Sequence, residues 1–312
     1  MSSDCQCLYT QGRYGKINPM TVKENKHVRW IDIEGPKAAD LAFLKKELGI
    51  HPIILEELKG PSARAHVDAY RDYLFFIYYF PLYDTADGSS VRTEIDFIVT
   101  KDTVATVHYE SLAKPLDGLT VKSEKSSLEL VYRIISQLIV FEERELRHIR
   151  EKAEQVGHDI FKDKEREVLE RLTYLKRDIS EYRIVEGLQR PILESLRTHG
   201  RKFWGGDADV YLNDLIGDHV RVMSQLEAYR SAVSDFEDTN NQLMNLKVNN
   251  VMKTFTTLSF LTFPFVLIAT LFTMRVPGVP LENQPGAFWI IVLGIALCML
   301  ALTVYFKFKK WF

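Results

Sequence analysis

The sequence predicts an α+β cytoplasmic domain, then a long stalk helix, and then two transmembrane helices. Charge is distributed unevenly: residues 1–253 are rich in Lys, Arg, Asp and Glu, whereas residues 254–306 contain one Arg and one Glu. Two apolar runs of about 20 residues, 254–274 and 287–306, are each long enough to cross roughly 30 Å of hydrocarbon. The alternative is a hairpin buried in a large soluble core, and the length of both runs disfavours it.

The first 125 residues have the pattern of a small sheet with short helices. The segment 35–50 predicts a helix, with Pro36 at its start and leucines spaced along one face. Runs of apolar, β-branched and aromatic residues, separated by turn residues such as DTADG, predict strands at 27–34, 73–82, 93–100 and 103–110.

From about Ser126 the sequence becomes charged and leucine-patterned, which predicts a pair of long helices with solvated faces. Acidic residues offset the basic ones throughout, so nucleic-acid binding is disfavoured. The glycine-rich segment 198–209 is expected to break the pattern, and Asp207 or Asp209 to cap the next helix. The predicted segments are therefore the α/β domain 1–125, helical segment 126–206, stalk 207–253, spans 254–274 and 287–306, external loop 275–286 and basic tail 307–312.

The predicted stalk helix has no Pro or Gly between Gly217 and Pro264. If it is unbroken from about residue 208 to 274, it is roughly 100 Å long. Its apolar residues recur in steps of three and four, with one doubled gap, which is the signature of helices packed side by side. They are Leu215, Val222, Leu226, Tyr229, Val233, Phe236 and Leu243. A small domain cannot cover so long a rod, so a homo-oligomer is expected.

The same rhythm continues into the first span and brings uncharged polar residues onto one stripe. Its members are Asn249, Met252, Thr256, Ser259, Phe263, Val266, Thr270 and Thr273. Two interpretations are open: close helix packing, which favours Ser and Thr, or a pore whose hydroxyls and amides face hydrated cations. The second span has no such stripe and is expected to lie outside, against lipid. Pro264 is consistent with a water-lined helix.

The distribution of basic residues predicts which side of the membrane each segment faces. The first residues contain no apolar stretch of the kind found in signal peptides. Lysines precede the first span and follow the second, whereas the loop between the spans balances one Arg against one Glu. The positive-inside bias therefore predicts a multi-pass protein of the plasma or bacterial inner membrane, with both termini cytoplasmic. Cys5 and Cys7 are expected in a loose tail, without a disulfide framework.

Four stretches resemble the CorA-type divalent metal channels, a magnesium-transporting family that includes the zinc-linked ZntB branch. They are HPIILEELKGPSARAHVDAYRDYLFFIYYF, TEIDFIVTKDTVATVHYE, NNVMKTFTTLSFLTFPFVLIATLF and the ending VYFKFKKWF. The resemblance implies a funnel-shaped homopentamer in which the first span lines the pore. It also implies passive movement of Mg²⁺ or another divalent ion, such as Zn²⁺ or Co²⁺, without a cofactor.

The resemblance further implies two sets of charged residues with regulatory roles. Intracellular Mg²⁺ closes the pore in this family through carboxylates on the stalk, which correspond here to Asp214 and Asp218. The alternative for this pair is a solvated acidic face. Lys253, Lys309 and Lys310 correspond to the family's basic collar, and the same lysines are suited to anchoring at lipid headgroups.

The sequence departs from the family at the outer end of the first span. The family carries Gly-Met-Asn there, whereas this chain has Thr273, Met274 and Arg275. Asn offers a neutral carbonyl acceptor, but Arg offers only donors and a permanent positive charge. Two outcomes are open: Arg275 pairs with Glu282 or extends to the headgroups and leaves conduction possible, or it faces the axis and alters divalent selectivity.

The sequence bears on three classes of function. A passive ion channel or transporter leads; a CorA-fold protein with monovalent or anion selectivity, or a non-conducting scaffold, is the alternative. An enzyme is not expected, because the sequence contains no P-loop, dinucleotide-binding glycine pattern, H-E-x-x-H or nucleophile elbow. His51, His66 and His108 in the α/β domain are expected to be structural.

Overall fold

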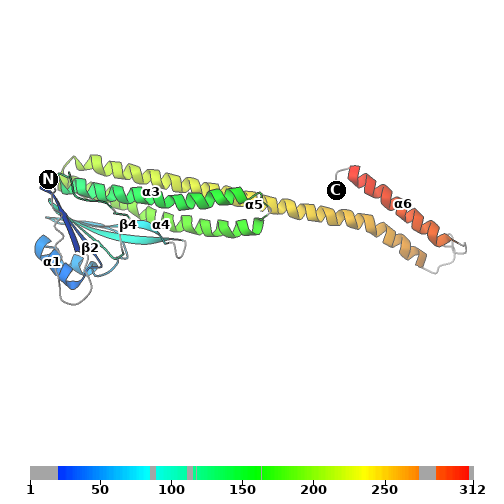
Figure 1. Ribbon diagram of the computed structural model, residues 1–312, viewed down its shortest axis with the longest axis horizontal. Coiled ribbons are helices and arrows are strands. Elements are labelled where there is room, and N and C mark those ends of the chain that lie inside the picture. Colours follow the sequence, from blue (N-terminus) through cyan, green and yellow to red (C-terminus); the bar gives the residue numbers. More distant parts are fainter. Residues whose placement is uncertain are drawn as a thin grey trace. The chain divides into compact units, whose positions relative to one another are not determined.

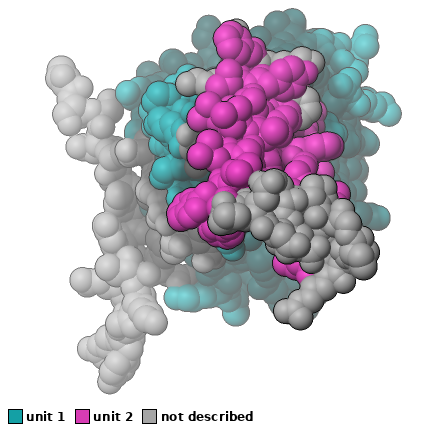
Figure 2. Space-filling view, turned by 90° about the vertical axis from the view of Figure 1, so that its right-hand side faces the viewer, with its two compact units in different colours: residues 1–236 teal, residues 237–312 magenta. Residues whose placement is uncertain are grey.

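The computed structural model describes residues 20–84, 89–110, 115–116, 118–162, 164–273 and 286–308. They form two compact units, Met1–Phe236 and Glu237–Phe312, which are coloured separately in Figure 2. Each unit is described by itself below.

A six-stranded mixed sheet organises the first unit. Its strands are β1 (Met20–Glu24), β2 (Arg29–Glu34), β3 (Val67–Ala69), β4 (Leu74–Asp84), β5 (Ser89–Val99) and β6 (Thr103–His108). They lie in the order β1-β2-β6-β5-β4-β3, and only β2 and β6 pair in parallel. The long β4–β5 hairpin has alternating aromatic residues on both faces, so helices must cover both faces.

Short helices α1 (Ala38–Leu48) and α2 (Pro52–Glu57) cover one face of the sheet. Leu44 and Ile54 from these helices join a buried cluster with Ile31, Phe75 and Tyr79 of the strands. The opposite face of the sheet contributes aromatic side chains such as Phe76 and Phe97, whose rings stack with centroids 4.5 Å apart.

Three long helices, α3 (Ser127–Asp159), α4 (Glu165–Trp204) and the first part of α5 (Ala208–Thr273), run side by side along that opposite face (Figure 1). Ser126 caps α3, because its hydroxyl accepts from the Glu129 backbone N–H at 3.3 Å. Polar contacts join α5 to both other helices: Tyr132 of α3 donates to Asp214 at 2.7 Å, and Arg183 of α4 pairs with Glu227 at 2.8 Å.

The predicted elements are mostly confirmed, with corrections at several points. Strands β1 and β3 and helix α2 were missed. Pro36 lies before α1 and its N-cap Lys37, not within the first turn. Helix α4 continues into the predicted break and ends within it, at Trp204, with Gly205 at its C-cap. Asp207 directly precedes α5, whereas Asp209 lies in its first turn and pairs with Arg201 at 3.6 Å. The domain boundaries proposed from the sequence remain predictions.

The apolar stripe of the stalk has a different partner from the one expected. Leu215, Val222, Leu226 and Val233 are buried within a single chain. The ring of Phe236 lies against Gly157 of α3, where a Cβ would come within 2.9 Å of it. This part of the stripe therefore packs on the chain's own helices, and it cannot be used to argue for identical neighbours.

Two glycines of α4 make a matched test of packing. A Cβ at Gly200 would lie 2.9 Å from Trp204 and 3.1 Å from Leu212, whereas a Cβ at Gly187 would meet no atom within 4 Å. We expect Gly200→Ala to destabilise the chain by about 1 kcal/mol despite its better helix propensity. Gly187→Ala should stabilise it by about 0.5–1 kcal/mol. Thermal unfolding checks both, and shifts of the same sign would contradict this packing.

Candidate ion path

The second unit contains two helices long and apolar enough to cross a membrane. They are the C-terminal part of α5, which ends at Thr273, and α6 (Ala287–Phe308). Only 11% of the apolar window of α5, and none of that of α6, is buried inside the chain. A helix of a soluble core would be mostly covered, so the exposure favours lipid or further protein as the surroundings of both helices.

The predicted stripe lies on one side of α5 and is uncovered by the rest of the chain. All eight positions are exposed: Asn249, Met252, Thr256, Ser259, Phe263, Val266, Thr270 and Thr273. The covered or half-covered positions of this part of α5 are Thr257, Leu261, Pro264 and Phe265. At 100° per residue, the two sets are centred roughly 180° apart on the helix.

Helix α6 has a single half-buried face, made of Ile291, Ile295, Leu302 and Phe306. The four positions recur at helical spacing, as expected for a helix that packs along a neighbour. The polar stripe of α5 points away from the side of that helix that is covered within the chain.

The hydroxyl groups at the outer end of the stripe act as hydrogen-bond donors within their own helix. Thr270 donates its hydroxyl proton to the Leu267 carbonyl at 2.8 Å, and Thr273 donates to the Thr270 carbonyl at 2.7 Å. Because each donor is used inside the helix, only oxygen lone pairs remain for an outside partner. Such oxygens suit a hydrated cation better than an anion.

Several predicted site residues cannot be placed. Met274, Arg275 and Glu282 of the outer mouth, and Lys309 and Lys310 of the collar, lie outside the described residues, as do Cys5 and Cys7. Lys253 is exposed on α5 in the second unit. Cys298 is a free cysteine, exposed on α6.

Asp214 and Asp218 lie one turn apart on α5, as their spacing requires, and each has a protein partner. Asp214 Oδ2 accepts from Tyr132, while Asp218 Oδ1 pairs with Arg221 at 3.1 Å. Burial raises the pKa of Asp218, Arg221 opposes the rise, and the charge of Asp214 adds to it. Within the described ranges no group of three or more His, Cys, Asp or Glu side chains could hold a metal.

Arg221 was missed in the sequence, although its spacing from Asp218 is typical of helix ion pairs. Its guanidinium also pairs with Glu143 of α3 at 2.8 Å. The candidate carboxylates are thus part of a polar layer between α3 and α5.

The three histidines of the α/β domain have structural contacts. His51 caps α2, its Nδ1 accepting from the Ile53 N–H at 3.3 Å, and His66 Nε2 lies 3.7 Å from both Glu57 and Asp68. His108 is buried beside Asp32, at 3.5 Å. Burial acts to lower the pKa of His108, but the hydrogen bond and charge of Asp32 outweigh it and raise the pKa.

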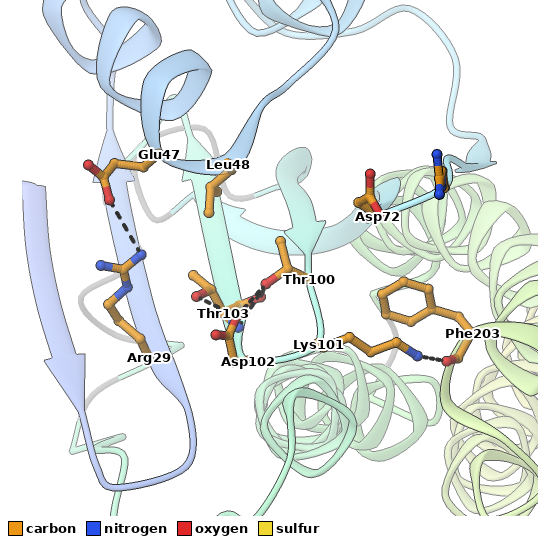
Figure 3. Close-up of a pocket in the computed structure, with 10 residues that line it drawn as sticks. Arg29, Glu47, Leu48, Asp72, Thr100, Lys101, Asp102, Thr103 and Phe203 are labelled. Atoms are coloured by element: carbon orange, nitrogen blue, oxygen red, sulfur yellow. Dashed lines mark hydrogen bonds and ion pairs between the residues drawn. The ribbon is translucent and has the colours of Figure 1, made fainter.

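A pocket of about 460 Å³ opens at the end of β5 and β6, beside α1 and the C-terminal end of α4. Figure 3 shows two contacts across this pocket: Arg29 faces Glu47, at 3.9 Å, and Lys101 donates to the Phe203 carbonyl. Asp102 accepts from the Thr100 and Thr103 hydroxyls. Acids and bases balance around this pocket, so it favours no class of ligand.

The α+β domain and the two long, apolar and largely uncovered helices together indicate a membrane protein with two spans. The chain belongs to the family of CorA-like Mg²⁺ transporter proteins, whose model matches residues 25–310. It is therefore a member of a family of divalent metal ion transporters, which are not enzymes. The fold class predicted from the sequence is confirmed.

Individual relatives agree with the family. The chain is 23% identical over 291 residues to the cobalt/magnesium transport protein CorA of Thermotoga maritima, covering 90% of this chain and 83% of the relative. Its fold is similar to that of the complete CorA magnesium transporter of Methanocaldococcus jannaschii, with a TM-score of 0.78, 20% identity and 93% of each chain covered. A full-length CmaX protein is also similar, with a TM-score of 0.67, 17% identity and coverage of 97% and 92%.

Proposed function

We propose that the chain moves divalent cations passively across a cell membrane as a homopentamer, with both termini in the cytoplasm. The observation that carries this proposal is the stripe on α5, which is polar, exposed and centred opposite the covered side of the helix. Copies of α5 arranged around an axis would turn this stripe toward a water-filled path and away from lipid. Hydroxyl and amide oxygens find hydrogen-bond partners in water but not in lipid tails, which supports such an arrangement.

In a homopentamer, each residue of the stripe would form a ring around the path, and these rings would be either polar or apolar. Thr270, Thr273, Ser259 and Thr256 would present oxygen lone pairs to a hydrated ion, as cation pathways require. Met252 and Phe263, which are 62% and 68% exposed in the chain, would form apolar constrictions suited to gating. In the absence of a nucleotide-binding motif, the membrane potential and the ion gradient would drive transport.

We propose that Arg275 at the outer mouth changes divalent selectivity relative to the family's Gly-Met-Asn. The side chain replaces a neutral acceptor with a permanent cation, which repels divalent ions wherever it faces the path. Glu282 is the acid in the external loop that can offset it. Lys253, Lys309 and Lys310 would form a basic collar at the inner surface, where they also anchor lipid headgroups.

The test of transport is uptake by the purified full-length chain in liposomes. We expect the protein to admit Mg²⁺ or Co²⁺ well above protein-free liposomes under an inside-negative potential, and to exclude chloride. Chloride uptake without divalent uptake would favour an anion path, and no flux of any ion would favour a non-conducting scaffold.

We also propose that Asp214 and Asp218 bind regulatory Mg²⁺ through its water shell. The carboxylates fit such an ion, because Mg²⁺ keeps several waters and needs only one or two acids. Asp214 is exposed. Burial raises the pKa of Asp218 and the charge of Asp214 adds to the rise, so a nearby cation would offset the repulsion between the two carboxylates.

The regulatory proposal predicts that millimolar Mg²⁺ slows proteolysis of the full-length protein. The double variant Asp214→Asn with Asp218→Asn should lose at least about 10-fold in Mg²⁺ affinity in this assay, because both charges are removed. Asp235→Asn on the same helix is the control. Equal protection of the double variant and the wild type would exclude the pair as the Mg²⁺ sensor.

A further inference from the structure

A buried polar cluster lies inside the helical bundle of the first unit, apart from the candidate ion path. It brings together Glu142 of α3, Glu186 of α4 and His219 of α5, whose exposed fractions are 0%, 0% and 2%. Ionisable side chains are rarely buried so completely without a partner of opposite charge. The family relationship assigns no role to this cluster.

Hydrogen bonds account for only part of the cluster. Gln189 donates from Nε2 to Glu142 Oε1 at 2.8 Å, and its Oε1 accepts from the Tyr78 hydroxyl at 2.7 Å. The His219 Nδ1 lies 3.2 Å from both Gln189 Oε1 and Glu186 Oε2. Glu142 Oε2 and both carboxyl oxygens of Glu186 have no hydrogen-bond partner of good geometry among the described residues.

The group that can satisfy these oxygens is a proton shared between the two carboxyls. Burial raises the pKa of Glu142 well above its usual range, and the charge of Glu186 raises it further. Burial likewise raises the pKa of Glu186 to about 8, while the nearby carboxyl of Glu142 opposes the rise. Two like charges in one dry site would be strongly unfavourable, so the site retains at least one proton near neutrality.

The other titratable groups around Glu142 and Glu186 do not change the conclusion that the two carboxyls retain at least one proton near neutrality. Burial and the charge of Arg190 lower the pKa of His219 to about 4, so the imidazole is neutral and its contact with Glu186 is not an ion pair. The remaining titratable neighbours are Tyr78 on β4, Tyr182 on α4, and Glu143 and Glu145 on α3. Arg190 is paired with Glu194, and Glu143 with Arg221.

We propose that Glu142 and Glu186 form a proton-sensitive contact that holds α5 against α3 and α4 and weakens as the surrounding solution becomes alkaline. Helix α5 contributes His219 to this contact and continues without interruption to Thr273. Loss of a proton from the pair would add a negative charge to the interior of the bundle, and moving α5 outward would let water reach this charge. The contact therefore couples proton concentration to the helix that carries the candidate ion path.

The direction of the pH effect follows from proton counting. A carboxyl of the unfolded chain loses its proton near pH 4.5, whereas Glu186 keeps its proton up to about pH 8 in the fold. The folded state therefore binds more protons than the unfolded state between these values, so stability falls as pH rises through the window. The loss is complete above about pH 8.

The test compares the full-length wild type with Glu186→Gln, which keeps the side chain's shape and removes its charge. From about pH 6 to about pH 9, we expect the unfolding midpoint of the wild type to fall by at least about 3 °C more than that of the variant. Glu170→Gln, at an exposed position of the same helix, should keep the full wild-type decrease. Hydrogen exchange of residues 212–226, corrected for intrinsic pH dependence, should accelerate above pH 8 only in the wild type and this control.

Infrared spectroscopy of the wild type gives a second readout that does not depend on how the variant folds. A protonated carboxyl has a C=O stretching band distinct from that of a carboxylate, and we expect the intensity of this band to decrease as pH is raised through about 8, where Glu186 loses its proton. Glu142→Gln removes the neighbouring carboxyl but not the burial of Glu186, so the decrease near pH 8 should persist in Glu142→Gln, at the same or a higher pH, and be absent from Glu186→Gln. Absence of the band near neutrality, or equal pH slopes in the wild type and Glu186→Gln, would overturn the proposal.

Discussion

Replacing Arg275 by asparagine is expected to raise divalent cation uptake about 20-fold in liposomes at physiological salt. Five arginines about 8 Å from a divalent ion repel it by roughly 5 kcal/mol in bulk-water dielectric. Screening at 0.15 M salt leaves about a third of this, or about 2 kcal/mol, at that distance. Removing the charge should therefore accelerate entry, with the larger gain at low ionic strength.

The salt dependence separates charge from shape at this position. Arg275→Lys keeps the charge without the guanidinium and should leave uptake near the wild-type rate. Raising salt from about 0.01 M to about 1 M should narrow the difference between wild type and Arg275→Asn, because the Debye length falls from about 30 Å to about 3 Å. Equal uptake by the two proteins at every salt concentration would show that Arg275 does not face the ion path.

The double substitution Thr270→Val with Thr273→Val is expected to reduce divalent uptake at least about 10-fold. Both hydroxyls donate to carbonyls of their own helix, so the lone pairs that remain are suited to a hydrated cation. Valine has nearly the same shape and presents a methyl group instead, so the path loses two rings of acceptor oxygens. Initial uptake rates of Mg²⁺ or Co²⁺ into liposomes measure the effect.

Matched controls lie elsewhere on the same two helices. Thr303 of α6 makes the same kind of bond, donating to the Met299 carbonyl at 2.7 Å, and Thr257 on the covered face of α5 donates to Lys253 at 2.8 Å. Thr303→Val and Thr257→Val should leave uptake within about twofold of the wild type, since neither hydroxyl faces the proposed path. An equal loss in the controls would indicate a general effect on helix packing instead.

Much of the fold could be predicted because its signals are local. The aromatic and β-branched runs that became β4, β5 and β6 are nearly continuous, as is typical of strands buried on both faces, and the leucine pattern after Ser126 predicted two long helices. Strands β1 and β3 were missed because they are short, with few buried residues, and owe their conformation to pairing with β2 and β4. The continuation of α4 through Gly200 depends on packing against Trp204 and Leu212, which no local pattern reveals.

The packing partner of each helix was harder to predict than the helix itself. The periodicity of Leu215, Val222 and Leu226 indicated side-by-side helices, but spacing alone does not distinguish another chain from α3 and α4 of the same chain. A usable signal was present for the buried carboxyls: Glu142 occupies a place in the apolar stripe of α3, between Leu138 and Leu146. Its meaning required Glu186, which is distant in sequence.

For the candidate ion path, the sequence identified the stripe, and the structure describes its exposure and its position relative to the covered face of α5. The outer mouth from Met274 to Glu282 lies outside the described residues, so the role of Arg275 stays a prediction from charge alone. The paired state of Asp218 with Arg221 was foreseeable from helix spacing, while the link from Arg221 to Glu143 was not.

The most direct test of the account is the water accessibility of the stripe in the assembled, membrane-embedded protein. In a background with Cys5, Cys7 and Cys298 replaced by serine, single cysteines are introduced at Thr256, Ser259 and Thr270, and at Leu293 of α6, which is 64% exposed in the chain. The account predicts that a small water-soluble thiol reagent modifies the three stripe positions and slows ion uptake, while Leu293→Cys stays unmodified. Modification of Leu293→Cys with protection of all three stripe positions would place the stripe against lipid and contradict the account.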